Sequence, residues 1–191
     1  MIDKKKLPMQ ITMGRIWLTI PIMAALYFNT PLWNLPAVVL FLIASISDYY
    51  DGYFARKYNA VSNMGKFMDP VADKILVTSI LTILILPGKV DPYLVNLLTA
   101  RDTLIGAIRS VAAADGLIIA ARASGKWKTA LQMGAIPAVM LGGSLPFLPD
   151  QGLWIGQAGS VLLWISVLLS IWSGIQYFQT YRDTRKATDH V

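Results

Sequence analysis

Six long apolar stretches dominate the sequence, and they constrain its fold more than any other feature. Each is close to the roughly 20 residues that a helix needs to cross a bilayer. Turn-forming sequences separate three pairs of them, namely "NTP", "LPGKVDP" and "PFLPDQG". The stretches are residues 10–28, 32–55, 68–86, 92–114, 129–148 and 153–181. This pattern predicts an all-α integral membrane protein with six transmembrane helices.

The composition agrees with a membrane protein and excludes several kinds of site. Of the 191 residues, 55% are hydrophobic and 15% are charged, whereas a soluble domain has about 25% charged residues. The chain has no cysteine, which excludes disulfides and thiolate metal sites, and its single histidine argues against a Ser-His-Asp triad or a histidine-rich zinc site. We expect one domain over residues 1–191, with a cytoplasmic N-terminal segment at 1–9 and a polar tail at 183–191.

The lysines and arginines are distributed unequally between the two sides that six spans would create. The side with the two termini and two connections carries nearly all of the lysines and arginines outside the spans, whereas the three loops on the other side contain only Lys89. Loops rich in Lys and Arg face the cytoplasm. We therefore expect both termini in the cytoplasm and the chain in the inner (cytoplasmic) membrane. The net charge of +6 then reflects topology and anionic lipid headgroups rather than nucleic-acid binding.

Four aspartates interrupt the apolar sequence where the second and third stretches meet. Asp48 and Asp51 are three residues apart, and Asp69 and Asp73 are four residues apart. On helices, each pair occupies one face. Because the two spans would be antiparallel neighbours, all four carboxylates should converge just inside the cytoplasmic surface.

Four carboxylates at such a position are costly unless cations neutralise them. An aspartate at a helix centre costs about 2.5–3.5 kcal/mol on insertion scales, and less near the interface. Two divalent ions would balance the four charges, and all-oxygen ligands suit Mg²⁺ or Mn²⁺. Two such ions indicate phosphoryl chemistry. The plainer interpretation is that the aspartates cap helix ends. A divalent-cation transporter is another alternative, although transport sites usually lie nearer the midplane.

Neighbouring residues strengthen the prediction of a phosphate site. Gly52 follows Asp51 directly, and Gly65 precedes Asp69 by four residues. A glycine lets a ligand or a helix approach closely, or simply packs helices together. Arg56 can offer its guanidinium to a phosphate or a nucleobase.

Together these residues resemble the signature of the CDP-alcohol phosphotransferases. Residues 48–73 read D-x-x-D-G-x-x-A-R, then eight residues, then G-x-x-x-D-x-x-x-D. Every signature position is filled, by Asp48, Asp51, Gly52, Ala55, Arg56, Gly65, Asp69 and Asp73. The six-span plan also matches that family, so the resemblance covers essentially the whole chain. It implies an enzyme that works as a homodimer with its active site at the cytoplasmic interface.

A second stretch, residues 101–133, bears on the acceptor alcohol. Asp102 and Arg109 are seven residues apart and hence on one helix face. Arginines within a membrane span are candidate functional residues, although Arg101 or Arg109 could merely neutralise Asp102. We expect Lys126 and Lys128 in the following cytoplasmic loop. A basic pocket beside a nucleotide site suits an anionic acceptor.

This stretch is similar to the phosphatidylglycerophosphate synthase branch of the family. Its tail matches G-K-x-K-T-x-x-Q, with Gly125, Lys126, Lys128, Thr129 and Gln132. The chain departs from that branch in two places. Asp102 stands where glutamate is usual, and "QITMGR" replaces "N-x-L-T-x-x-R", keeping Thr12 and Arg15 but not the asparagine.

The resemblance implies transfer of a phosphatidyl group from CDP-diacylglycerol to sn-glycerol 3-phosphate, with release of CMP. It implies two Mg²⁺ or Mn²⁺ ions on Asp48, Asp51, Asp69 and Asp73, with Asp73 also the general base. Contacts to CDP-diacylglycerol would come from Gly52, Arg56 and Ser62. The acceptor phosphate would be held by Arg109, Lys126, Arg101 and Arg182. The same chemistry on inositol phosphate or serine is the closest alternative.

Overall fold

The computed structural model describes residues 7–57, 63–115, 123–145 and 149–189. Within these residues the chain forms six α-helices and no strand. The helices are α1 (Leu7–Phe28), α2 (Pro31–Lys57), α3 (Asn63–Ile83), α4 (Pro92–Ala114), α5 (Ala123–Leu141) and α6 (Pro149–Asp189). The all-helical prediction is therefore confirmed, with one helix for each apolar stretch.

In the part of the chain that the structure describes, three helices are long and apolar enough to cross a membrane. The qualifying segments are Met9–Phe28 in α1, Pro31–Asp48 in α2 and Asp150–Arg185 in α6. Large apolar side chains are also exposed along the bundle, among them Trp17, Val39, Leu104 and Leu168. An exposed apolar surface of this extent is typical of a protein that faces lipid.

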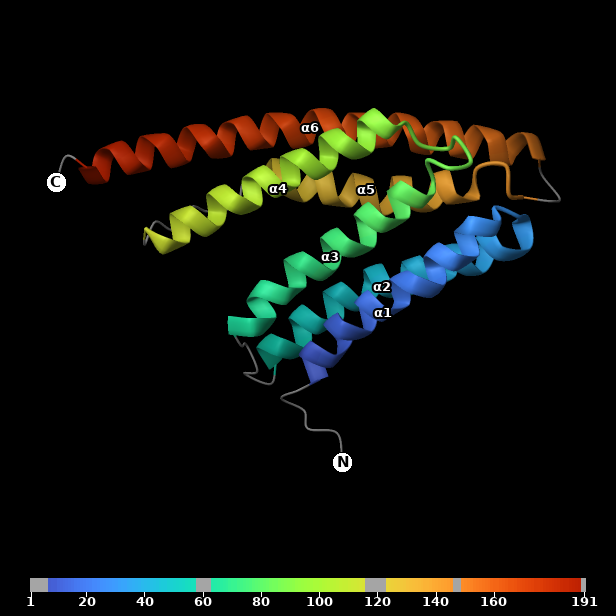
Figure 1. Ribbon diagram of the computed structural model, residues 1–191, viewed down its shortest axis with the longest axis horizontal. Coiled ribbons are helices and arrows are strands. Elements are labelled where there is room, and N and C mark those ends of the chain that lie inside the picture. Colours follow the sequence, from blue (N-terminus) through green and yellow to red (C-terminus); the bar gives the residue numbers. More distant parts are fainter. Residues whose placement is uncertain (1–6, 58–62, 116–122, 146–148, 190–191) are drawn as a thin grey trace.

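The helices run back and forth along one another (Figure 1). The ends of α1, α3 and α5 and the starts of α2, α4 and α6 lie toward the right of the picture. Helix α1 packs on α2 and α3, α6 packs on α5 and α4, and α2 contacts α5. The core between them contains fully buried apolar side chains such as Phe41, Leu76, Leu94 and Ile136. This arrangement brings the end of α2 and the start of α3, which carry the aspartates, to the same end of the bundle.

Local sequence explains where several helices begin and end. Asp91 caps α4, because its Oδ1 accepts a hydrogen bond of 2.8 Å from the Tyr93 N–H, and Pro92 occupies the first helical position. Gly88 and Gly143 have positive φ angles of 71° and 69°, which glycine adopts without steric cost. Gly143 lies two residues beyond the end of α5 and turns the chain toward α6.

The position of α5 differs from the prediction. It spans residues 123–141 rather than 129–148, so the expectation that Lys126 and Lys128 lie in a loop is wrong. Both lie in the first two turns of the helix. Lys128 is only 7% exposed and pairs with Asp102 of α4. That contact between distant residues joins the start of α5 to α4, in a segment that looks polar in the sequence.

A polar cluster joins the interhelical turns at the opposite end of the bundle from the aspartates. The fully buried Asn34 donates to Ser144 Oγ at 2.6 Å, and Lys89 Nζ donates to the carbonyl of Met140 at 3.2 Å. Lys89 therefore lies at the C-terminus of α5, where a cation is favourable. Burial lowers the pKa of the Lys89 ammonium below its ordinary value.

Candidate active site

Helix α1 supplies hydrogen-bond donors to two of the aspartates. The Thr12 hydroxyl donates to Asp69 Oδ1 at 2.9 Å, and Arg15 Nη1 donates to Asp48 Oδ1 at 2.7 Å. Thr12 and Arg15 are each only 1% exposed. Asp48 comes from α2 and Asp69 from α3, so α1 holds both carboxylates in place. Sequence reasoning did not place Thr12 and Arg15 in the site, although their retention in "QITMGR" was a signal.

Asp73 lies one helical turn beyond Asp69 on α3. Its Oδ1 is buried, and within the described part of the chain it accepts no hydrogen bond. A buried carboxylate oxygen without a partner is costly. Such an oxygen is suited to accept a proton or to bind a cation.

The carboxylates do not form a complete metal cluster among the residues that the structure describes. No group of three or more metal-ligating side chains occurs there, and the side chain of Asp51 lies outside this description. The residues nevertheless fit an oxygen-bound divalent ion. The described bonds from Thr12 and Arg15 reach Oδ1 of Asp69 and Asp48, so Oδ2 of these carboxylates could bind an ion, and the Asp73 carboxylate could add a further ligand.

A cavity of about 1060 Å³ lies beside Asp73, between α3, α4, α5 and α6. Among the residues that the structure describes, its charged lining consists of four basic and two acidic side chains, an excess of two positive charges. These side chains are Asp73, Lys74, Arg101, Asp102, Arg109 and Lys128. The structure thus places predicted acceptor-site arginines in the same cavity as the predicted general base. Lys74 lines it as well, although no sequence pattern had singled it out.

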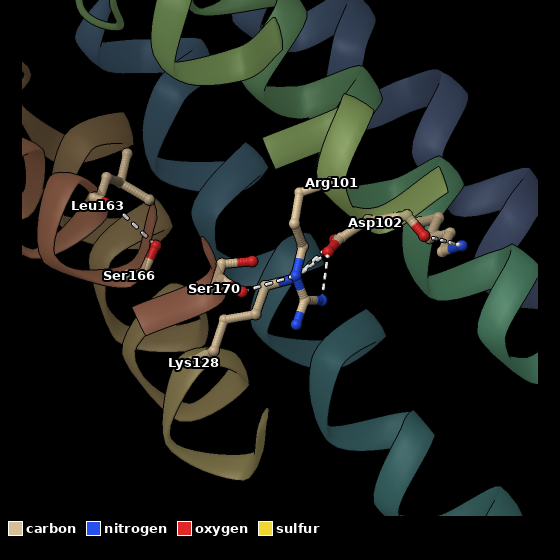
Figure 2. Close-up of polar contacts among 7 residues, drawn as sticks. Arg101, Asp102, Lys128, Leu163, Ser166 and Ser170 are labelled. Carbon is tan, nitrogen blue, oxygen red and sulfur yellow. Dashed lines mark hydrogen bonds and ion pairs between the residues drawn. The ribbon is translucent and has the colours of Figure 1, made fainter. Parts of the chain in front are cut away.

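Asp102 is shared by two cations, as Figure 2 shows. Arg101 Nη1 lies 2.9 Å from Asp102 Oδ1, and Lys128 Nζ lies 2.5 and 2.6 Å from the two carboxylate oxygens. Arg101 Nε also donates to the carbonyl of Ser170 on α6 at 2.7 Å. The network therefore ties α4 to α5 and α6. Arg101 and Asp102 do neutralise one another in part, but the second cation leaves this group positive.

Arg109 lies two turns farther along α4 and makes a different contact. Its guanidinium carbon lies 5.2 Å from the centre of the Tyr177 ring on α6, a cation–π arrangement that leaves the charge unneutralised. Within the described residues Arg109 forms no ion pair. It is exposed and lines the cavity. This arginine is therefore available to an anion beside Asp73.

The remaining predicted residues are placed less directly. Gly52 and Arg56 lie in the last turns of α2, and Lys126 lies in the first turn of α5, but their surroundings lie outside the description, as does Ser62 altogether. Arg182 lies on an exposed part of α6 and is not among the residues that line the cavity. Taken together, the described side chains form a basic cavity that could admit a small anion next to a carboxylate.

Comparison with known proteins assigns the chain to a family. The model of the CDP-alcohol phosphatidyltransferase family matches residues 5–172. A protein of Rickettsia bellii is 35% identical over 92% of this chain and 94% of its own length. A Bacillus subtilis protein is 35% identical over 96% of this chain and 98% of its own length. An Arabidopsis thaliana protein is 34% identical over 91% of this chain and 78% of its own length. The first two are named CDP-diacylglycerol–glycerol-3-phosphate 3-phosphatidyltransferase, and the third bears the same name with the number 2.

The matched region includes all four aspartates, both donors on α1 and the six charged residues of the cavity. The match therefore covers these charged residues, helices α1 to α5 and α6 as far as residue 172. The chain belongs to the CDP-alcohol phosphatidyltransferase family.

Proposed function

We propose that this chain transfers a phosphatidyl group from CDP-diacylglycerol to sn-glycerol 3-phosphate, giving phosphatidylglycerophosphate and CMP. The observation that carries this proposal is the cavity in which Arg101, Arg109 and Lys128 lie beside Asp73. A cavity with two excess positive charges suits an acceptor whose phosphate is a dianion. The names of the relatives specify this same donor and acceptor.

Asp73 is the proposed general base. Its unpartnered Oδ1 accepts the proton of the acceptor hydroxyl, which makes the oxygen a better nucleophile. The oxygen then attacks the phosphorus that carries the diacylglycerol, and the bond from that phosphorus to the CMP oxygen breaks. Asp73 lines the cavity, so an acceptor bound there could present its hydroxyl to the carboxylate.

Asp48, Asp51, Asp69 and Asp73 would hold two divalent ions, Mg²⁺ or Mn²⁺. When bound, these ions would bind the pyrophosphate of the donor and neutralise the charge that develops on the leaving CMP. The hydrogen bonds from Thr12 and Arg15 support this role, because a donor bonded to a carboxylate ligand fixes the orientation of that ligand.

The two substrates would occupy different parts of the site. Gly52, Arg56 and Ser62 would contact the cytidine diphosphate of the donor. Arg109 and Arg101 would hold the acceptor phosphate from within the cavity, assisted by Lys126 and Arg182 at its cytoplasmic side.

We further propose that the whole chain forms one membrane domain with six spans, both termini in the cytoplasm and the site at the cytoplasmic face of the inner membrane. Exposed aromatic side chains at the end of the bundle away from the aspartates support this placement, since such residues gather at membrane interfaces. They are Tyr27, Phe28, Trp33, Tyr93 and Trp154. An enzyme so placed meets a lipid donor and a soluble acceptor. The active form would be a homodimer, as the family resemblance implies.

An acceptor panel tests the function. Purified protein in detergent or vesicles would receive CDP-diacylglycerol, Mg²⁺ or Mn²⁺, and one of glycerol 3-phosphate, inositol phosphate or serine. We expect CMP release with glycerol 3-phosphate at a kcat/KM well above that of the other acceptors. Turnover with inositol phosphate or serine alone would reassign the acceptor. Metal flux in proteoliposomes without CMP release would instead indicate a transporter.

A further inference from the structure

Lys74 occupies the cavity without a role in the mechanism described above. It follows Asp73 on α3, and both side chains line the cavity. Lys74 Nζ donates a hydrogen bond of 2.9 Å to the main-chain carbonyl of Asp102 on α4. Among the described residues it forms no ion pair. Its partner is thus a neutral carbonyl, and its positive charge remains uncompensated.

Gly106 explains how the ammonium group reaches that carbonyl. Gly106 lies one turn after Asp102 on α4, and a Cβ built on it would lie 2.8 Å from Lys74 Nζ. Such a distance is too short for a real contact, so any side chain at position 106 would displace the ammonium. The absence of a side chain here lets Lys74 lie directly against the backbone of α4.

The other basic residues of the cavity are differently engaged. Arg101 and Lys128 share the carboxylate of Asp102, whereas Arg109 lies over the Tyr177 ring. Lys74 and Arg109 therefore carry the two cavity charges that no described carboxylate compensates. An ammonium has three N–H donors, and the Asp102 carbonyl uses one of them.

We propose that Lys74, positioned by Gly106, binds the acceptor phosphate together with Arg109 and thereby selects acceptors that carry a phosphate. This inference rests on the proposed function. Because Lys74 and Asp73 are adjacent on α3, the same turn of helix would hold the phosphate and receive the proton from the hydroxyl. The spacing between them favours a short acceptor with a phosphate at one end and a hydroxyl at the other.

The first test removes the charge and keeps the length of the side chain. For Lys74→Met we expect the KM for glycerol 3-phosphate to rise about 10-fold to 100-fold, as for loss of one charge-assisted hydrogen bond. The KM for CDP-diacylglycerol should change less than about twofold, which would also show that the variant is folded. The inhibition constant of inorganic phosphate should rise by a factor similar to that for the KM of glycerol 3-phosphate.

The second test moves the charge without removing it. Gly106→Ala should displace the Lys74 ammonium and weaken glycerol 3-phosphate binding, whereas Gly134→Ala, whose Cβ would meet nothing within 4 Å, should not. In the Lys74→Met background, Gly106→Ala should have no further effect, because the group that it displaces is already absent. An additive effect of the two substitutions would mean that Gly106 acts independently of Lys74.

Calorimetric binding of glycerol 3-phosphate separates this inference from the proposed function, because binding does not require turnover. An unchanged affinity in Lys74→Met, or an unchanged inhibition constant for inorganic phosphate, would overturn the inference even if wild-type protein releases CMP. The opposite result is also possible: glycerol 3-phosphate binds wild-type protein and binding is lost in Lys74→Met, but no CMP is released. This result would contradict the proposed function and support the inference.

Discussion

The hydrogen bond from Thr12 to Asp69 offers a sharp test of how α1 contributes to the site. Valine has the shape of threonine but cannot donate a hydrogen bond, so Thr12→Val removes this bond and little packing. The bond is 2.9 Å long, and Thr12 is 1% exposed. A hydrogen bond to a charged group contributes about 1.5–3 kcal/mol. Because Asp69 itself is only partly buried, we expect the lower part of that range.

About 1.4 kcal/mol corresponds to a tenfold change in an equilibrium constant. We therefore expect Thr12→Val to weaken Mn²⁺ binding about tenfold, which agrees with the roughly 10–100-fold losses seen when hydrogen-bond partners of metal ligands are removed. Higher Mn²⁺ concentrations should restore most of the kcat. The KM for glycerol 3-phosphate, measured at saturating metal, should remain close to that of wild type.

The assay is a titration of CMP release against Mn²⁺, paired with direct Mn²⁺ binding followed by electron paramagnetic resonance. Thr12→Ser keeps the hydroxyl and is the matched control, which should bind Mn²⁺ within about twofold to threefold of wild type. Folded Thr12→Val with wild-type Mn²⁺ affinity would refute the idea that this bond orients a metal ligand.

Three other substitutions test separate parts of the structure. Asp69→Asn should abolish CMP release and weaken Mn²⁺ binding, and near-normal activity would contradict a role in binding two ions. Arg109→Ala should raise the KM for glycerol 3-phosphate far more than that for CDP-diacylglycerol, whereas equal effects would indicate a structural arginine. Gly159→Ala should destabilise the α5–α6 contact, because the added Cβ would lie 2.8 Å from the Val139 nitrogen and 2.9 Å from the Ala135 carbonyl oxygen. The cost should be about 1–3 kcal/mol, visible as a lower Tm in detergent, with Gly134→Ala as the control.

The positions of the helices could be predicted because apolar length and turn residues are local properties. The main error concerned the start of α5, where the polar segment around Lys126 and Lys128 is helical. Lys128 is buried there because it pairs with Asp102, 26 residues earlier in the chain. No local pattern reveals such a pair, since it depends on how α4 and α5 pack.

The candidate site could be predicted only in part, because some of its contacts also depend on how the helices pack. The spacing of the aspartates placed them on common helix faces, and Arg101 and Arg109 were correctly expected to lie on one helix. Thr12 and Arg15 contact residues 57 and 33 positions away, and Lys74 meets the backbone of α4 only because position 106 is glycine. These contacts come from the packing of α1 against α2 and α3 and of α4 against α3, which the sequence does not display.

The central claim is that Asp73 and the basic cavity beside it carry out phosphatidyl transfer to glycerol 3-phosphate. The most direct measurement quantifies both products from purified protein, CDP-diacylglycerol and glycerol 3-phosphate, with CMP by chromatography and the lipid by mass spectrometry. We predict equal amounts of CMP and phosphatidylglycerophosphate from the wild type, none after chelation of divalent metal, and none from Asp73→Asn. CMP release without the phosphorylated lipid, or full activity of Asp73→Asn, would contradict the account.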